Sequence, residues 1–382
     1  MSARPPQVTE DQSTQVDPAN LEELSPAVEV REGELPKSLW RVRLQLAWQT
    51  FKKNWGLFAE NKIGLFGLVV ILFFALMALA HPILRAVGPW ENDAIYDPRI
   101  GYDAPVAELE VVASEADVVD ATQQIDAITA QLYCFGALPG DTCRIAQQPA
   151  PPSEGHVLGT DPLGRDIASQ LTFSTRAAFL LGLIAAVVTV GIATSIGSIA
   201  AFYGGWLDNF LMRFADLILL MPLIPILIVM SGLWEITLPL LGVLIGVLNG
   251  FGGTAIVLKS QALSVKVKPF IDAARVSGGS NMHLIFKHIV PNVLPLSFLY
   301  MMFSVTEAVS LEATLSFFGL LNVDMSWGIM LNTAQDQGYL RTGLEYWWLL
   351  IPAGVAVTLL AAGFFFAGRA MDEVINPRLR AR

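Results

Sequence analysis

Residues 272–291 read Asp-Ala-Ala-Arg-Val-Ser-Gly-Gly-Ser-Asn-Met-His-Leu-Ile-Phe-Lys-His-Ile-Val-Pro, a polar stretch between two long apolar runs. Helix-forming residues flank Gly278-Gly279, and two glycines permit a turn with little steric penalty. The stretch therefore predicts two short helices joined at a bend. Each helix has one apolar face, made of Ile271, Ala274, Met282, Ile285, Phe286 and Ile289.

The whole chain is too apolar for a soluble domain of its size. Of its 382 residues, 53% are hydrophobic and 15% are charged, and the mean hydropathy is +0.52. These values indicate an integral membrane protein. The net charge of −10 arises from acidic residues in the N-terminal tail and after the first apolar run, while Lys and Arg cluster beside apolar runs. No basic run is interleaved with aromatic residues, which argues against nucleic-acid binding.

Six apolar runs are long enough to cross a bilayer. They cover residues 63–84, 177–203, 210–234, 238–258, 293–317 and 349–367. The loop 259–291, after the fourth run, is expected in the cytoplasm by the positive-inside rule. Its basic residues are Lys259, Lys266, Lys268, Arg275 and Lys287. Both termini are then expected on the same cytoplasmic side.

The N-terminal residues differ from the rest in composition. Residues 1–37 are rich in Pro, Glu and Gln and are expected to form a disordered cytoplasmic tail. They have no apolar core and an acidic start, so they are not a signal peptide. Residues 38–62 mix apolar, aromatic and basic side chains. This composition fits a helix in the inner membrane interface, or equally a juxtamembrane stretch with snorkelling basic residues.

A long polar insert, residues 85–175, separates the first two spans and is poor enough in basic residues to be expected outside. The spacing of Val and Ile over residues 106–132 predicts a small helical excursion. Cys134 and Cys143 can close a disulfide ring in an exported loop, with free buried thiols as the alternative. The insert ends in a turn, where Asp166 can cap the next helix.

Three features inside the predicted spans stand out. Pro222 and Pro225 are expected to break the third span. The fourth span is rich in glycine, which allows neighbouring helices to approach closely. Glu307 and Glu312 interrupt the fifth span. Because a carboxylate facing lipid is costly, Glu312 is expected to face the helix bundle.

Four stretches resemble one known family. Residues 272–291 resemble the cytoplasmic coupling loop of ABC importer permeases, which reads Glu-Ala-Ala, then Gly, then His and Pro. The matching residues are Asp272 (in place of the usual Glu), Ala273, Ala274, Gly278, His288 and Pro291. Residues 158–166, Leu-Gly-Thr-Asp-Pro-Leu-Gly-Arg-Asp, resemble a signature of the C-type permease of dipeptide and oligopeptide importers, and so do residues 312–319 and 326–331. The insert is longer than in that subfamily, and Asn376 replaces its usual Asp.

The resemblance implies an all-α integral membrane protein with the six-helix type I ABC importer permease fold, and a core over residues 176–382. It implies an importer of dipeptides or oligopeptides in a bacterial or archaeal cell membrane, not an enzyme. The implied partners are a second permease, two cytoplasmic ATPase subunits and an extracytoplasmic binding protein. ATP and Mg would be bound by the ATPases, with no cofactor in this chain. The residues that would couple the chain to the ATPases are Asp272, Ala273, Ala274, Arg275, Gly278, His288 and Pro291. The translocation path or gate would involve Glu307 and Glu312.

Other functions fit parts of the sequence. An ion-gradient-driven transporter could use Glu307 and Glu312 as proton or cation sites, although no internal repeat of broken helices supports it. Relatives within the same family carry oligosaccharides or nickel chelates. An intramembrane enzyme lacks any supporting motif. His283 and His288 have no Cys or carboxylate at ligand spacing, which disfavours a metal site. Without the other motifs, Asp272-Ala-Ala would fit an ordinary amphipathic loop helix equally well.

Overall fold

The computed structural model describes residues 48, 49, 52, 55–88, 90, 94–120 and 123–375. The chain divides into Met1–Lys53 and a second compact unit, Asn54–Arg382, and the description below concerns the second. The predicted tail, residues 1–37, lies outside the described residues, as do residues 38–47 of the predicted interfacial helix and the C-terminal residues 376–382. Residues 55–60 are helical.

Four helices are long and apolar enough to cross a membrane. They are α2 (Lys62–Val87), α4 (Ile167–Tyr203), the helix Asn281–Phe317 and α13 (Trp347–Ile375). Two bent pairs pass the same test: α5 (Gly205–Leu220) with α6 (Leu223–Leu233), and α7 (Leu238–Phe251) with α8 (Gly253–Lys266). Counting each pair as one span gives six spans in the described part of the chain. The sequence-based expectation of an all-α, six-span protein is therefore confirmed.

Both bends have a local cause. The α5–α6 bend of 81° follows Pro222, which has no N–H to continue the helix. The Met221 N–H instead bonds to the Ile218 carbonyl at 3.1 Å, which tightens the last turn of α5. The α7–α8 bend of 47° lies at Gly252, whose backbone leaves the helical region. The sequence pattern predicted one unbroken helix over residues 238–258, and the glycine pair 252–253 divides it.

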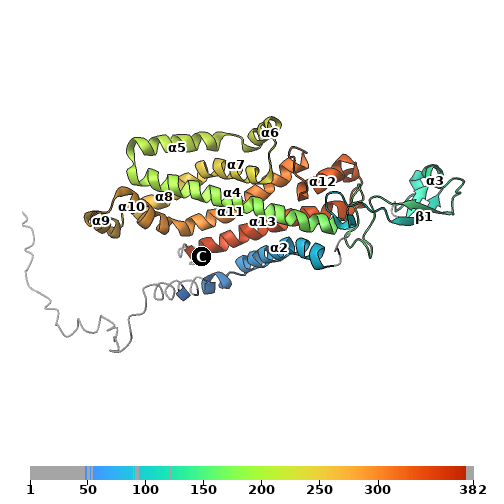
Figure 1. Cartoon of the computed structure of the whole chain (residues 1–382), viewed down its shortest axis with the longest axis horizontal. Helices are drawn as coiled ribbons and strands as arrows, with labels where there is room; N and C mark the ends of the chain where they lie inside the picture. Colours follow the sequence, from blue (N-terminus) through green and yellow to red (C-terminus); the bar gives the residue numbers. More distant parts are fainter. Residues whose placement is uncertain are drawn as a thin grey trace, which may run out of the picture. The chain divides into compact units, whose positions relative to one another are not determined.

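Helix α4 lies at the centre of the unit and contacts α7, α8, α2 and α11 (Val290–Phe317), with α7 and α2 on opposite sides of it (Figure 1). Glycines bring α7 close to it. A Cβ at Gly242, Gly246 or Gly250 would lie 3.1, 2.9 or 3.1 Å from a carbonyl oxygen of α4. The close approach confirms the packing role expected of these small residues.

The insert between α2 and α4 contains a small sheet of order β2-β1-β3. Strand β1 (Val106–Val112) pairs in parallel with β2 (Gln124–Asp126) and antiparallel with β3 (Thr142–Ala146), and α3 (Ala127–Tyr133) packs beside them. The predicted helical excursion over residues 106–132 is therefore wrong for its first half. Leu109 and Val111 alternate with Glu108 and Glu110, and a period of two places the apolar pair on one buried face of a strand.

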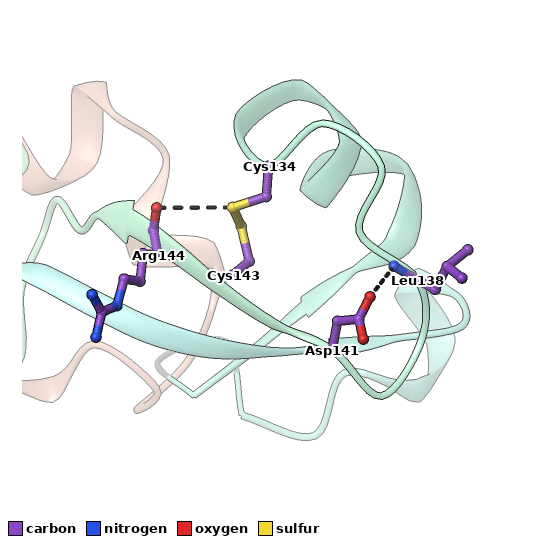
Figure 2. Close-up of a disulfide and its surroundings, with 5 residues drawn as sticks. All are labelled: Cys134, Leu138, Asp141, Cys143 and Arg144. Atoms are coloured by element: carbon purple, nitrogen blue, oxygen red, sulfur yellow. Dashed lines mark hydrogen bonds between the residues drawn. A yellow bond between two sulfur atoms is a disulfide. The ribbon is translucent and has the colours of Figure 1, made fainter.

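A disulfide joins Cys134, at the end of α3, to Cys143 on β3, as the sequence suggested (Figure 2). The Cα atoms are 5.8 Å apart. Cys143 lies in the core of the insert with Leu109, Val111, Ile125 and Ala130. The bond therefore fastens α3 to the sheet. The following helix, α4, begins at Ile167, before residue 175, the predicted end of the insert.

Candidate functional site

The predicted coupling segment contains one short helix, α9 (Pro269–Val276). Ile271 is fully buried in an apolar cluster that includes Phe202 of α4 and Leu258 of α8, and Ala274 packs against this cluster. The opposite face of α9 is apolar and exposed. It consists of Phe270, Ala273 and Val276, which we call the outward face. Ala274 thus packs α9 against the rest of this chain, whereas Ala273 is exposed to a partner subunit.

The bend after α9 depends on both glycines, for different reasons. Gly278 has φ +87°, a left-handed conformation that side chains with a Cβ rarely adopt. Gly279 needs space, because its N–H donates to the Ala274 carbonyl at 3.1 Å and a Cβ there would lie 2.9 Å from that oxygen. The bend predicted at Gly278-Gly279 is therefore confirmed.

Charged side chains at the end of α8 and on α9 contact the C-terminal end of α4. The Arg275 guanidinium lies 6.0 Å from the centre of the Phe202 ring, and the Lys266 ammonium donates to the Ala201 carbonyl at 3.0 Å. Arg275 also pairs with Asp272 at 3.2 Å. Both members of this pair are exposed, so it contributes little to stability. A displacement of α9 would be passed to α4 through the contact of Arg275 with Phe202 and through the buried apolar cluster.

The second short helix of the prediction is not separate. α10 (Asn281–Leu284) continues through a π turn, Ile285–Ile289, into α11. Pro291 has no N–H and stands in the first turn of α11. The π turn before it is wider than an α-helical turn, since the Val290 N–H bonds to the carbonyl of Ile285, five residues earlier, and this wider turn accommodates the proline. His288 lies in the π turn, and its backbone carbonyl accepts from the Asn292 amide at 2.7 Å. His288 and Pro291 therefore shape the start of a long membrane helix.

At the opposite end of α4, the motif of residues 158–166 folds on itself. The Asp161 carboxylate accepts from the backbone N–H of Leu163 and Arg165, both at 2.9 Å, and pairs with the Arg165 guanidinium at 2.6 Å. Gln170 donates to the same carboxylate at 3.0 Å. The indole of Trp348, on α13, donates to the Thr160 carbonyl. The motif is a rigid turn that joins α4 to α13.

A buried histidine connects this turn to the insert. His156 Nδ1 lies 2.9 Å from the Asp166 carboxylate, which caps α4, and Nε2 lies 3.0 Å from the Asp103 carboxylate. The Tyr96 ring stands 5.9 Å from the imidazole. Burial lowers the pKa of His156, but the two carboxylates outweigh it and raise the pKa above its ordinary value. Sequence reading did not single out this triad, because Asp103 lies 53 residues before His156 in the chain.

The triad predicts a pH-dependent stability. A histidine with a raised folded-state pKa contributes stability that is present below about 6.5 and is lost as the pH rises through the folded value. Wild-type protein should therefore melt at a higher temperature at about pH 6 than at about pH 8, and His156→Gln should reduce this difference. Fluorescence-detected thermal unfolding of the purified chain measures it. An equal pH dependence in both proteins would show that His156 stays neutral.

Glu312 faces the helix bundle as expected. Only 2% of it is exposed, and its carboxylate accepts from the Ser316 hydroxyl at 2.7 Å and hydrogen bonds with Ser326. Ser326 caps α12 (Trp327–Asp336). Gly328 of α12 approaches so closely that a Cβ there would lie 2.5 Å from the Ala313 carbonyl. Glu312 thus lies at the junction of α11 and α12.

Glu307 has different surroundings. It is exposed in the isolated chain, and its carboxylate accepts from the Asn249 side-chain amide at 2.9 Å. Five residues separate Glu307 from Glu312, which is about 140° around a helix, so the two carboxylates point to different neighbours. The structure does not bring them together. Asn249 was missed in the sequence, where it is one polar residue in a glycine-rich run.

The helix pattern defines a multi-pass membrane protein. Residues 193–381 match the family described as "Binding-protein-dependent transport system inner membrane component". The oligopeptide transport system permease OppC of Haemophilus influenzae is 32% identical over 257 residues, which cover 66% of this chain and 80% of that protein. The chain therefore belongs to this family of transport-system membrane components.

Further relatives have similar coverage. OppC of Bacillus subtilis is 32% identical over 64% of this chain and 79% of its own length. The dipeptide transport system permease DppC of the same bacterium is 29% identical over 62% of this chain and 73% of its own length. The similarity to peptide-transport permeases that was suggested by the two motifs is thus confirmed.

Proposed function

We propose that this chain is one permease of an ATP-driven importer of dipeptides or oligopeptides. The observation that carries the proposal is the pairing of a short helix, α9, at one end of α4 with a rigid motif at the other end. Relatives with printed peptide-transport names support the cargo class. Oligosaccharides, nickel chelates and an ion-gradient mechanism are the less supported alternatives.

The coupling mechanism follows from the contacts of α9. The outward face of α9 docks on a cytoplasmic ATPase subunit, which binds ATP and Mg, and this chain holds no cofactor. A second permease completes the transmembrane path, a second ATPase subunit completes the ATP-hydrolysing pair, and an extracytoplasmic binding protein delivers the peptide. Movement of α9 reaches α4 through Ile271 and Arg275. This connection between the ATPase and α4 also depends on the other residues of the coupling motif, which are Asp272, Ala273, Ala274, Gly278, His288 and Pro291.

We propose that the insert lies outside the cell and that α9 and both termini lie in the cytoplasm of a bacterial or archaeal cell. The insert joins the N-terminal end of α4 and α9 packs at its C-terminal end. The 37 residues of α4 span about 55 Å, more than the hydrocarbon core. Opposite ends of α4 therefore lie on opposite sides.

Thiol labelling of intact cells tests this orientation. Val119→Cys, in the exposed part of the insert, should react with a membrane-impermeant maleimide, whereas Val267→Cys, beside α9, should react only after the membrane is opened. Both native side chains are well exposed. The opposite labelling pattern would invert the orientation.

The transport function is tested in vesicles. The chain is reconstituted with a second permease and two ATPase subunits from the same organism, and radiolabelled trialanine is supplied with the cognate binding protein. Uptake that requires ATP, and that survives collapse of the ion gradients, is expected. Uptake driven by a proton or sodium gradient without ATP would support the ion-gradient alternative.

A further inference from the structure

The two bent helix pairs meet at one cavity. A space of about 160 Å³ is lined by Ile218 and Met221 at the end of α5, Leu248 and Asn249 of α7, Gly252 at the second bend and Glu307 of α11, among others. Non-helical backbone at membrane depth is tolerated only where it is buried in protein or lines a water-filled cavity. Two bends at one cavity therefore mark a place where broken helix backbone faces protein or water and not lipid.

Glu307 is too deep to be a surface residue of the membrane interface. It lies ten residues before the end of α11, or about 15 Å along the helix axis. A carboxylate at such depth costs about 2.5–3.5 kcal/mol against lipid, so it faces a water-filled path or a partner. Among the residues that the structure describes, no Lys, Arg or His forms an ion pair with Glu307, and Asn249 is its hydrogen-bond donor.

Most of the hydrogen-bonding capacity that remains at the pair is that of acceptors. The Asn249 amide donates one N–H to Glu307, which leaves its second N–H as a donor, and its carbonyl oxygen and the second carboxylate oxygen as acceptors, at the cavity. Apolar side chains form much of the remaining wall. A primary ammonium fits this arrangement, because it brings three donors, one positive charge and no acceptor. An anionic group would meet repulsion from the carboxylate.

We propose that Glu307 and Asn249 form a site for a primary ammonium group of the cargo during passage through the membrane. The inference rests on the proposed function as a peptide permease. The ammonium comes from a lysine side chain or from the peptide N-terminus, and both have the same chemistry. The site makes the permease selective for cargo charge, in addition to any selection by the binding protein.

Uptake of matched peptides by the reconstituted importer tests the site. The probes are Ala-Lys-Ala, trialanine, Ala-Glu-Ala and N-acetyl-trialanine, each supplied at a concentration that saturates the binding protein, as checked by direct binding. Glu307→Gln is compared with Glu235→Gln, which removes the same charge from an exposed residue between α6 and α7 outside the cavity. Co-purification of the partner subunits is measured for both variants.

A side-chain ammonium site predicts that Glu307→Gln lowers uptake of Ala-Lys-Ala about tenfold relative to Ala-Glu-Ala, which is the loss of one charged hydrogen bond. An N-terminal ammonium site predicts a similar loss for trialanine relative to N-acetyl-trialanine. Glu307→Asp and Glu235→Gln should preserve both ratios. Asn249→Ala, which removes the second acceptor, should change the same ratio as Glu307→Gln.

Equal losses for all four peptides, or unchanged ratios, would overturn the ammonium site. Loss of co-purifying subunits with Glu307→Gln would overturn it too, and would identify Glu307 as a contact to the second permease. These results differ from failure of the proposed function, in which the wild-type importer itself takes up none of the four peptides with ATP. That failure would also remove the basis of the inference.

Discussion

Ala273→Trp is expected to lower peptide uptake at least about tenfold while leaving the chain folded and inserted. Ala273 lies in the middle of the outward face of α9, between Phe270 and Val276, and its side chain is exposed. An indole at this position would hold α9 away from the ATPase, and a tenfold loss requires only about 1.4 kcal/mol of lost docking energy. Substrate-stimulated ATP hydrolysis should fall together with uptake.

Gly278→Val tests the same connection through the backbone. The Cβ of a residue at 278 would meet no neighbouring atom within 4 Å, so the substitution acts through φ +87° and not through a clash. Forcing a β-branched residue into this conformation costs about 1–3 kcal/mol, and the bend after α9 should shift. Uptake and ATPase rates in reconstituted vesicles should again fall together.

Ala113→Trp is the matched control for Ala273→Trp. Ala113 is exposed in the insert, at the other end of α4, so the same change in volume should leave transport intact. Ala274→Trp should act differently from Ala273→Trp, because Ala274 packs against the buried cluster and an indole there would disturb the fold. Full transport by both Ala273→Trp and Gly278→Val would show that α9 is an ordinary loop helix.

Most of the membrane architecture could be predicted because hydropathy is a sum over about 20 residues. The bend at Gly278-Gly279 was also predictable, since glycine at a turn is a local signal. The orientation of α9 was not. Ala273 and Ala274 are both small and apolar, and only the position of Ile271 in the buried cluster decides which one faces outward. The spacing of Phe270, Ala273 and Val276 at every third residue could have indicated the outward face.

The insert shows how two patterns compete. Valines at residues 111, 112, 118 and 119 fit a helical spacing, yet alternation from Ala107 to Val111 gives a strand with Leu109 opposite Cys143. β-Branched residues favour this outcome, but pairing with β3 across about 35 residues of chain decides it, and such pairing is not visible in a local window. The same limit hid the contacts His156–Asp103 and Glu307–Asn249, whose partners come from distant segments.

Glu312→Ala is expected to destabilise the junction of α11 and α12, with a loss of about 1–3 kcal/mol for buried hydroxyls left without their acceptor. The carboxylate is buried and hydrogen bonds with Ser316 and Ser326. Beside it, the Trp327 indole donates to the Leu171 carbonyl at 3.2 Å and so holds α12 against α4. The amount of folded protein recovered in detergent, and its thermal midpoint, should both decrease.

Glu312→Gln separates this fastening role from a role in the translocation path. Glutamine keeps an acceptor for one serine at nearly the same volume, so folding should be almost preserved, and the fastening role predicts nearly normal uptake per folded molecule. Glu312 does not line the cavity that contains Glu307, which favours fastening. If Glu312→Gln folds normally but transports poorly, the charge itself is required, and Glu312 belongs to the path or gate that the sequence suggested.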